Sequence, residues 1–283
     1  MNQTVSYSEA DIRALVNQIL GNLDATGPAA PSAPARADDA PRNALAVPNP
    51  ANRAAYDEMI ASTPARIGAW RAGTRPTVAS LLRFRADHAG AMDAVFSDVS
   101  DETLSRLGLF CVQSAATDRA AFLMDPNIGA AFNPETARQL SDHCTHGAQV
   151  QIIVADGLSS AAVEGNVADV LPALTQGLKR YNLSVGTPVF VKFGRVRIMD
   201  EVTALVGSEV TILLVGERPG LVTNESLSCY MTYKGHPGMA ESARTVVSNI
   251  YRDGTAPVEA GAYIAEIAQK MIDTKTSGMD LKL

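Results

Sequence analysis

Two charged side chains stand where a strongly apolar segment stops. Residues 211–215 are Thr-Ile-Leu-Leu-Val, and after Gly216 the residues Glu217 and Arg218 enter a turn fixed by Pro219 and Gly220. The apolar run predicts a strand covered on both faces, and in open parallel sheets ligands bind at the carboxyl ends of such strands. Two interpretations stand here: a ligand-recognition loop, or an exposed ion pair at a turn.

A second candidate site follows another apolar segment. Residues 150–155 predict a strand, Asp156-Gly157-Leu158-Ser159-Ser160 the turn after it, and residues 161–170 a helix. Amides at a helix N-terminus favour an anion, so this turn is a candidate nucleotide or phosphate cradle. It matches neither the three-glycine dinucleotide fingerprint nor the lysine-bearing phosphate loop, and the alternative role of Ser159 is a simple helix cap.

The histidines add little further chemistry. The chain has no Gly-x-Ser-x-Gly segment, and no Ser or Cys partner is evident for His88, His143, His146 or His236. His143, Cys144 and His146 are close in sequence but lack a usual zinc spacing, and a histidine near a helix end is favourable without a metal. The sequence therefore predicts recognition loops without a self-contained catalytic set.

The elements that must position these loops alternate between strand and helix from residue 148 onward. The pattern predicts further strands at residues 187–193 and 227–233, and helices at residues 202–206, 241–251 and 260–271. A helical stripe over residues 163–178 contains Pro172, which is expected to break or restart the helix. This alternation predicts an α/β fold with a Rossmann-like, mostly parallel sheet and helices on both faces.

Three regions precede this predicted domain of residues 148–283. Residues 1–23 predict an amphipathic helix for targeting or docking, and the Ala- and Pro-rich residues 24–53 a disordered tether. Residues 54–147 predict a helical subdomain. This region contains a polar cluster of Arg83, Arg85, Asp87 and His88. We interpret the cluster as part of a subunit interface in preference to a ligand clamp.

Composition limits the class of partner. The chain has 283 residues, a net charge of −6 and no basic cluster, which argues against nucleic acid or an acidic membrane as partner. Cys111, Cys144 and Cys229 lack CxxC spacing, so neither a disulfide framework nor a structural zinc site is predicted. Without a long apolar run or a signal peptide, we expect a cytosolic protein or one packaged from the cytosol.

Seven short motifs, in this order, resemble the small (light) subunit of ethanolamine ammonia-lyase. They extend from the helical region to near the C-terminus and comprise Leu82–Ala89, Ala155–Ser159, Gly186–Pro188, Gly194–Val196, Gly216–Leu221, Glu225–Tyr230 and Ser248–Ile250. The resemblance implies an adenosylcobalamin-dependent carbon–nitrogen lyase that converts ethanolamine to acetaldehyde and ammonia by radical chemistry. In that family the large subunit holds the substrate and the catalytic residues, and the small subunit covers part of the cobalamin.

Site residues and partners follow from the same resemblance. The family's cobalamin contacts carry over to Val196, Glu217 and Val246, and many relatives have Cys at the position of Val246. No catalytic residue is expected in this chain. The implied partner is the large subunit, in a dodecamer of six small and six large subunits, located in the bacterial cytoplasm inside a microcompartment.

The chain lacks an Asp-x-His-x-x-Gly segment, with which another group of cobalamin enzymes replaces the cofactor's own base by a histidine. A base-on cofactor is therefore expected. Two other functions remain as alternatives: a stand-alone Rossmann-like enzyme that binds a nucleotide at Asp156–Ser160, and a scaffold or cargo adaptor that works through the N-terminal helix and tether.

Overall fold

The computed structural model describes residues 46–282, which divide between Ser80 and Leu81 into two units. The first unit contains helix α2 (Arg53–Ala61), whose N-cap Asn52 accepts the Ala55 N–H, and the short antiparallel pair β1 (Arg71–Ala72) and β2 (Arg75–Pro76). The helix predicted over residues 1–23 and most of the tether predicted over residues 24–53 lie outside the described residues.

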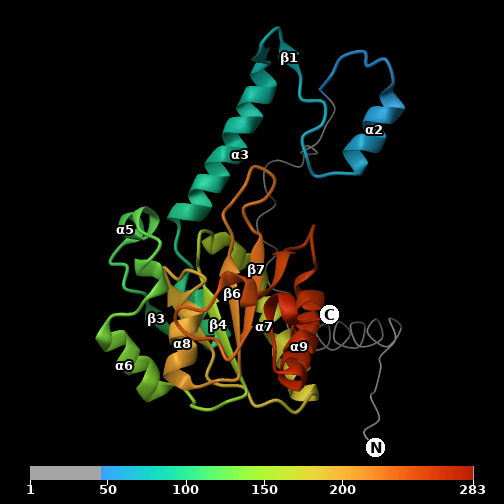
Figure 1. Cartoon of the computed structure of the whole chain (residues 1–283). Helices are drawn as coiled ribbons and strands as arrows, with labels where there is room; N and C mark the ends of the chain where they lie inside the picture. Colours follow the sequence, from blue (N-terminus) through green and yellow to red (C-terminus); the bar gives the residue numbers. More distant parts are fainter. Residues whose placement is uncertain (1–45, 283) are drawn as a thin grey trace, which may run out of the picture. The chain divides into compact units, whose positions relative to one another are not determined.

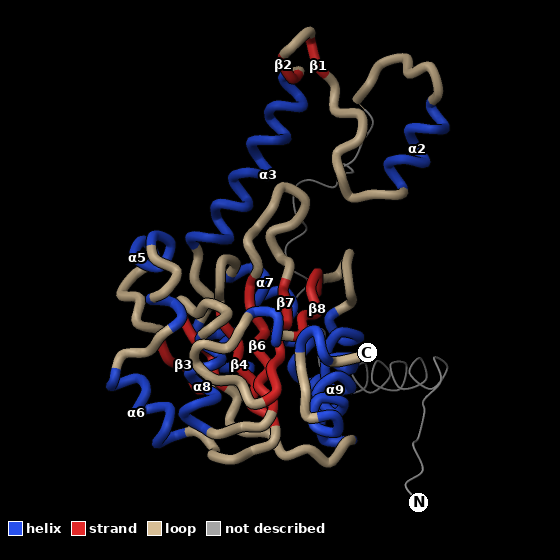
Figure 2. The backbone as a smooth tube through the Cα atoms, in the orientation of Figure 1, coloured by secondary structure: helices blue, strands red, loops and turns tan. Residues whose placement is uncertain are grey.

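A six-stranded sheet forms the centre of the second unit, in the order β3-β5-β4-β6-β7-β8 (Figures 1 and 2). Its strands are β3 (Phe110–Gln113), β4 (Val150–Ala155), β5 (Val189–Lys192), β6 (Val210–Gly216), β7 (Leu227–Tyr233) and β8 (Thr245–Ile250). The strands β3, β5, β4 and β6 are parallel, whereas β7 runs antiparallel to β6 and to β8. The prediction of an α/β fold built on a mostly parallel sheet is confirmed.

Helices cover both faces of this sheet. Helices α7 (Ser160–Arg180) and α9 (Pro257–Thr274) pack together on one face, and α6 (Pro134–His143) and α8 (Ile198–Val206) on the other (Figure 1). The remaining helical segments of the second unit include most of α3 (Val78–Phe96), together with α4 (Asp101–Leu107), α5 (Arg119–Met124), η1 (Ile128–Ala130), η2 (Glu241–Ala243) and η3 (Gly278–Asp280). The predicted helices on both faces are thus present.

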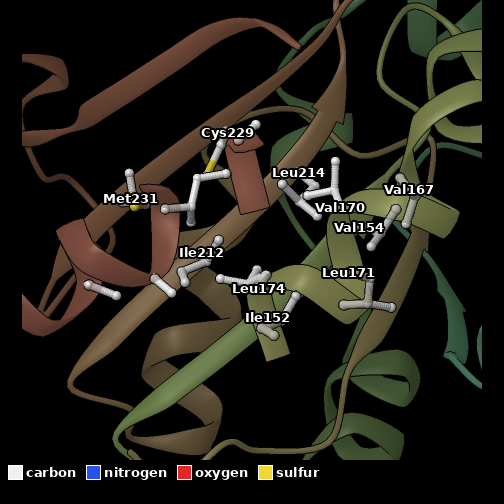
Figure 3. Packing of buried hydrophobic residues seen from close by; sticks show 14 of the residues in the cluster. Ile152, Val154, Val167, Val170, Leu171, Leu174, Ile212, Leu214, Cys229 and Met231 are labelled. Atoms are coloured by element: carbon white, nitrogen blue, oxygen red, sulfur yellow. The ribbon is translucent and has the colours of Figure 1, made fainter. Parts of the chain in front are cut away.

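Alternate residues of the central strands face the two helical layers. Ile152 and Ile212 pack with Leu174 of α7 in a first hydrophobic cluster (Figure 3). Ile153 and Leu213 belong instead to a second hydrophobic cluster, which also contains the buried residues Ile198, Met199, Val202 and Val206 of α8. Such alternation follows from the two-residue period of a strand. Every residue of β4 and β6 is buried, so the prediction that residues 211–215 form a strand covered on both faces is confirmed.

The segment predicted as a helix over residues 241–251 is instead η2 followed by strand β8. That prediction was wrong, because Thr245, Val246, Val247 and Ile250 are β-branched and favour an extended backbone. Pairing with β7 then supplies hydrogen bonds that a local sequence pattern does not reveal. The position of Val246 is therefore on a strand of the sheet.

Two further local predictions need correction. Helix α7 continues through Pro172 to Arg180, so the proline neither breaks nor restarts it. Proline removes one helical hydrogen bond, but Leu171, Leu174 and Leu178 are buried on both sides of it, and tertiary packing holds the helix. Strand β3 was not predicted; it lies within the region expected to be helical and pairs with β5, and from Leu81 on that region shares one unit with the sheet.

Candidate functional site

The carboxyl ends of the parallel strands bring the two sequence-predicted loops together. A Cβ atom on Gly216, at the end of β6, would lie 2.1 Å from the Ser159 carbonyl oxygen and 2.4 Å from that of Asp156. A Cβ atom on Gly157 would lie 2.3 Å from the Gly216 oxygen, and Gly157 has φ +56°. The turn after β4 therefore rests directly on the end of β6, and both glycines are needed for this approach.

The polar groups of the Asp156–Ser160 turn are largely used within the fold. Leu158 N donates to Gly216 O at 3.0 Å, and Ser159 N donates to Asp156 O at 3.0 Å. The Ser159 hydroxyl oxygen accepts the Ala162 N–H at 3.1 Å as the N-cap of α7, and its O–H donates to the Asn224 carbonyl. These contacts support the helix-cap interpretation of Ser159 over a phosphate cradle.

Asp156 itself is a buried carboxyl group that holds the next turn along the sheet edge. Its side chain is 1% exposed, and Oδ1 accepts the Gly194 N–H at 3.3 Å. Arg119 Nη1 lies 3.5 Å from Oδ2. Burial raises the pKa of Asp156 to about 6, against the opposing effects of Arg119 and of the Phe193 and Gly194 amides.

The turn after β5 carries Val196 and is fixed on several sides. Phe193 has φ +58°, and a Cβ atom on Gly194 would lie 2.8 Å from the Ala155 Cβ. Arg195 N donates to the Gly129 carbonyl at 2.7 Å, and the Arg195 guanidinium carbon lies 4.2 Å from the centroid of the Phe122 ring. Val196, directly after, is half-buried against the second hydrophobic cluster, beside α8.

Glu217, after β6, is paired with a tyrosine. Its backbone N–H donates to Ser226 O at 3.0 Å, and the Tyr230 hydroxyl donates to Glu217 Oε1 at 3.1 Å. Burial, together with the charge of Glu217, raises the pKa of Tyr230 to about 12, so the phenol stays protonated at neutral pH. Over residues 46–282, Glu217 makes no ion pair with Arg218, which argues against the interpretation as a surface ion pair at a turn.

Val246 lies on β8 directly opposite Tyr230 of β7, and Tyr230 in turn lies opposite Leu213 of β6. Residues opposite each other across a sheet point to the same face. Leu213 and Tyr230 both pack in the second hydrophobic cluster, so this is the face covered by α8. Val246 is 46% exposed there. The structure thus places Val196, Glu217 and Val246 on one side of the sheet, with Glu217 and Val246 next to Tyr230.

Sequence reasoning missed two features: a partner of Glu217 and a buried ion pair close in sequence to the two valines. One is Tyr230, which stood only as the last residue of a strand motif; the other is the buried ion pair of Arg244 with Asp200. Arg244 Nη1 and Nη2 donate to the two Asp200 oxygens at 2.9 and 2.7 Å, and its Nε donates to Glu241 at 2.7 Å. The polar tip of Tyr230, on the strand after Glu217, is a visible sequence signal. That its hydroxyl reaches Glu217 depends on how β6 and β7 pair, which only the structure shows.

The residues of the conceivable metal site do not converge. The His143 ring stacks on Phe110 with centroids 3.9 Å apart, His146 Nε2 lies 2.7 Å from the Ser141 carbonyl oxygen, and Cys144 is buried. Within residues 46–282, no three His, Cys, Asp or Glu side chains are grouped so as to hold a metal ion. These side chains therefore serve packing and local hydrogen bonding.

The polar cluster on α3 contains an ion pair between Arg83 Nε and Asp87 Oδ2 at 3.3 Å, and the His88 ring stacks on Phe84. Its assignment to a subunit interface stays a prediction. Among the helices in the part of the chain that the structure describes, none is both long and apolar enough to cross a lipid bilayer.

Comparisons with known proteins agree on one family. Residues 53–282 match the family model described as ethanolamine ammonia-lyase light chain (EutC). The ethanolamine ammonia-lyase small subunit of Clostridium perfringens is 52% identical over 84% of this chain and 81% of the relative. That of Clostridium tetani is 47% identical over 98% of this chain and 100% of the relative, and that of Listeria monocytogenes is 50% identical over 84% and 81%.

Proposed function

Because the chain belongs to the ethanolamine ammonia-lyase light chain family, we propose that it is the small subunit of an adenosylcobalamin-dependent lyase. The enzyme converts ethanolamine to acetaldehyde and ammonia. In this proposal the large subunit holds the substrate and the catalytic residues, and the present chain covers part of the cobalamin. The observation that carries the proposal is that Glu217 and Val246 both adjoin Tyr230, on the same side of the sheet as Val196.

The residues present fit a corrin. Tyr230 occupies Oε1 of Glu217, and among residues 46–282 no partner is seen for Oε2, which is free to accept N–H bonds from the amide side chains of the corrin rim. Val246, 46% exposed, offers apolar surface for the ring. Valine carries no sulfur, so the contact proposed at position 246 is one of packing and of the neighbouring backbone.

This chain's residues bind, orient and shield, and the bound cofactor supplies the radical chemistry. Glu217 holds the rim through hydrogen bonds, while Val196 and Val246 exclude water from the face they contact. Asp156 fixes the turn that presents Val196 by accepting the Gly194 N–H. A base-on cofactor remains part of the proposal, since the sequence has no Asp-x-His-x-x-Gly segment to supply a replacement histidine.

Assembly and location are also proposed. The large subunit is the partner, in a dodecamer of six small and six large subunits, and the complex works in the bacterial cytoplasm inside a microcompartment. The segment proposed to direct encapsulation is residues 1–23 with the tether that follows. Deleting residues 1–50 should then abolish encapsulation and leave deamination intact; loss of deamination with encapsulation unchanged would refute the targeting role.

The central test is reconstitution. The chain and the large subunit are produced separately and together, and assembly is followed by size-exclusion chromatography with light scattering. Deamination of ethanolamine is measured with added adenosylcobalamin, and we expect it only when both chains are present. The proposal fails if the chain never associates with the large subunit and its addition does not restore deamination.

A further inference from the structure

We infer that Tyr230 is a positioning residue that fixes Glu217 and Val246 in one arrangement for the corrin. The inference rests on the proposed function and adds a residue to it. Tyr230 is suited to this role because it touches both partners: its hydroxyl bonds the Glu217 carboxylate, and its backbone pairs with Val246 across β7 and β8.

The hydrogen bond restrains a side chain that the loop alone does not hold. Glu217 stands at the start of the loop after β6, where Arg218 and Gly220 are exposed. The carboxylate has three rotatable side-chain bonds, and a hydrogen bond to a charged acceptor is stronger than one between neutral groups. With Oε1 held by Tyr230 at 3.1 Å, the direction of Oε2 is set as well.

The Tyr230 hydroxyl stays protonated at neutral pH. Burial and the charge of Glu217 raise the pKa of Tyr230 to about 12. The phenol therefore remains a hydrogen-bond donor at neutral pH. This leaves Oε2 as an acceptor for N–H groups of a ligand, which is what a corrin rim carries.

The ring itself is anchored by the core. Tyr230 lies between Leu213 of β6 and Val246 of β8, and its ring packs in the second hydrophobic cluster. Cross-strand neighbours on one face have Cβ atoms about 4.5–5.5 Å apart, so the ring also limits the positions open to Val246. One side chain thus relates a residue on a loop to a residue on the last strand of the sheet.

The same strand provides a matched control. Tyr233 lies three residues beyond Tyr230, so it faces the opposite layer, where it packs against the cluster that contains α7 and α9. Tyr233→Phe removes a hydroxyl from the same strand without touching Glu217. Its effect reports any general cost of deleting a tyrosine hydroxyl from β7.

The experiment uses the complex of this chain with the large subunit and cyanocobalamin as the probe, with bound probe measured by absorbance after equilibrium dialysis. Tyr230→Phe should weaken cobalamin binding roughly three- to tenfold. The variant loses the hydrogen bond that positions the Glu217 carboxylate, but Glu217 itself remains and keeps part of its proposed contact with the corrin. Tyr233→Phe should bind within about twofold of the wild type. Urea unfolding of each purified chain should give similar midpoints for both variants.

A double variant separates positioning from general stability. In a Glu217→Ala background the carboxylate is gone, so adding Tyr230→Phe should change the affinity by less than about twofold. If the full effect of Tyr230→Phe persists there, or if Tyr230→Phe alone binds as the wild type does, the inference is wrong. If the wild-type complex assembles but does not retain cobalamin, the proposed function fails too, and that outcome is visible before any variant is compared.

Discussion

Replacing the buried carboxyl group at the end of β4 should change how the stability of this protein depends on pH. Asp156 is 1% exposed, and burial raises its pKa to about 6 from the ordinary 3.8. The folded chain therefore holds the Asp156 proton more tightly than the unfolded chain does. The resulting stabilisation is complete below pH 3.8 and is lost as the pH rises through about 6.

The magnitude follows from the size of the shift. A difference of 6 − 3.8, or about 2.2 pKa units, corresponds to about 3 kcal/mol at 1.36 kcal/mol per unit. Asp156→Asn keeps the shape of the side chain and an oxygen for the Gly194 N–H, but it has no proton to lose. Part of this difference is already lost at pH 4, so relative to this variant the wild type should lose about 2 kcal/mol of unfolding free energy between pH 4 and pH 7.

The assay is urea unfolding of the purified full chain, followed by circular dichroism at half-unit steps from pH 4 to pH 8. Wild type and Asp156→Asn are compared at each step, so that titration of all other groups cancels to first order. Asp253→Asn is the control, since that side chain is 70% exposed. A wild-type minus variant difference that stays constant, or that grows with pH, would refute the reasoning about burial.

Four further substitutions, one of them an exposed control, test the packing of the second unit by the same urea assay. Gly216→Ala should destabilise the chain by about 2 kcal/mol, because its Cβ would lie 2.1 and 2.4 Å from two backbone oxygens of the turn after β4. Leu174→Ala should cost about 2–5 kcal/mol through a cavity beside β4, whereas Leu82→Ala, 62% exposed, should cost under about 0.5 kcal/mol. Arg244→Ala should cost about 3–5 kcal/mol because it leaves Asp200 buried without its partner.

Different results would contradict each of these in turn. A Gly216→Ala chain as stable as the wild type would mean that the turn can move away from β6. Equal costs at the buried and the exposed leucine would contradict the cavity argument. If Arg244→Ala were as destabilising in an Asp200→Asn background as in the wild type, the cost would come from lost packing, and the ion-pair argument would fail.

The central strands could be predicted because their sequences carry enough information by themselves. Residues 150–155 and 227–233 were predicted as strands and have those bounds in the structure. β4 is fully buried and reads as a nearly continuous apolar run, whereas in β7 the apolar Leu227, Cys229 and Met231 alternate with Ser228, Tyr230 and Thr232. Strand β8 is different: Val246, Ser248 and Asn249 are exposed, so its pattern is weak and its strand state depends on pairing with β7.

The candidate site could be predicted only in part, because some of its contacts depend on strand pairing and not on a local sequence pattern. Glu217 was found because a charged residue after an apolar run is a local feature. Tyr230 was not, because its contact with Glu217 spans 13 residues and depends on the antiparallel register of β6 and β7. The neighbourhood of Val246 needed both that register and the strand β8, which the sequence pattern did not reveal.

The buried ion pair shows how the proposed contacts keep their spacing. Asp200 lies in the first turn of α8, shortly after Val196, and Arg244 lies two residues before Val246. The bidentate contact at 2.9 and 2.7 Å therefore ties the start of α8 to the start of β8, and with them the two valines. Burial of such a pair contributes little net stability compared with apolar packing, so its value here lies in the geometry it fixes.

A site fixed in this way has a consequence for binding. The Arg244–Asp200 pair relates Val196 to Val246, and the Tyr230 hydroxyl relates Glu217 to the same strands. All of these contacts are made within this chain, without a partner. Ordering side chains on binding opposes association, so a surface ordered beforehand binds a rigid ring more tightly than a mobile surface of the same composition. If the proposed function is right, this chain therefore presents its part of the proposed corrin site in an ordered form before the large subunit binds.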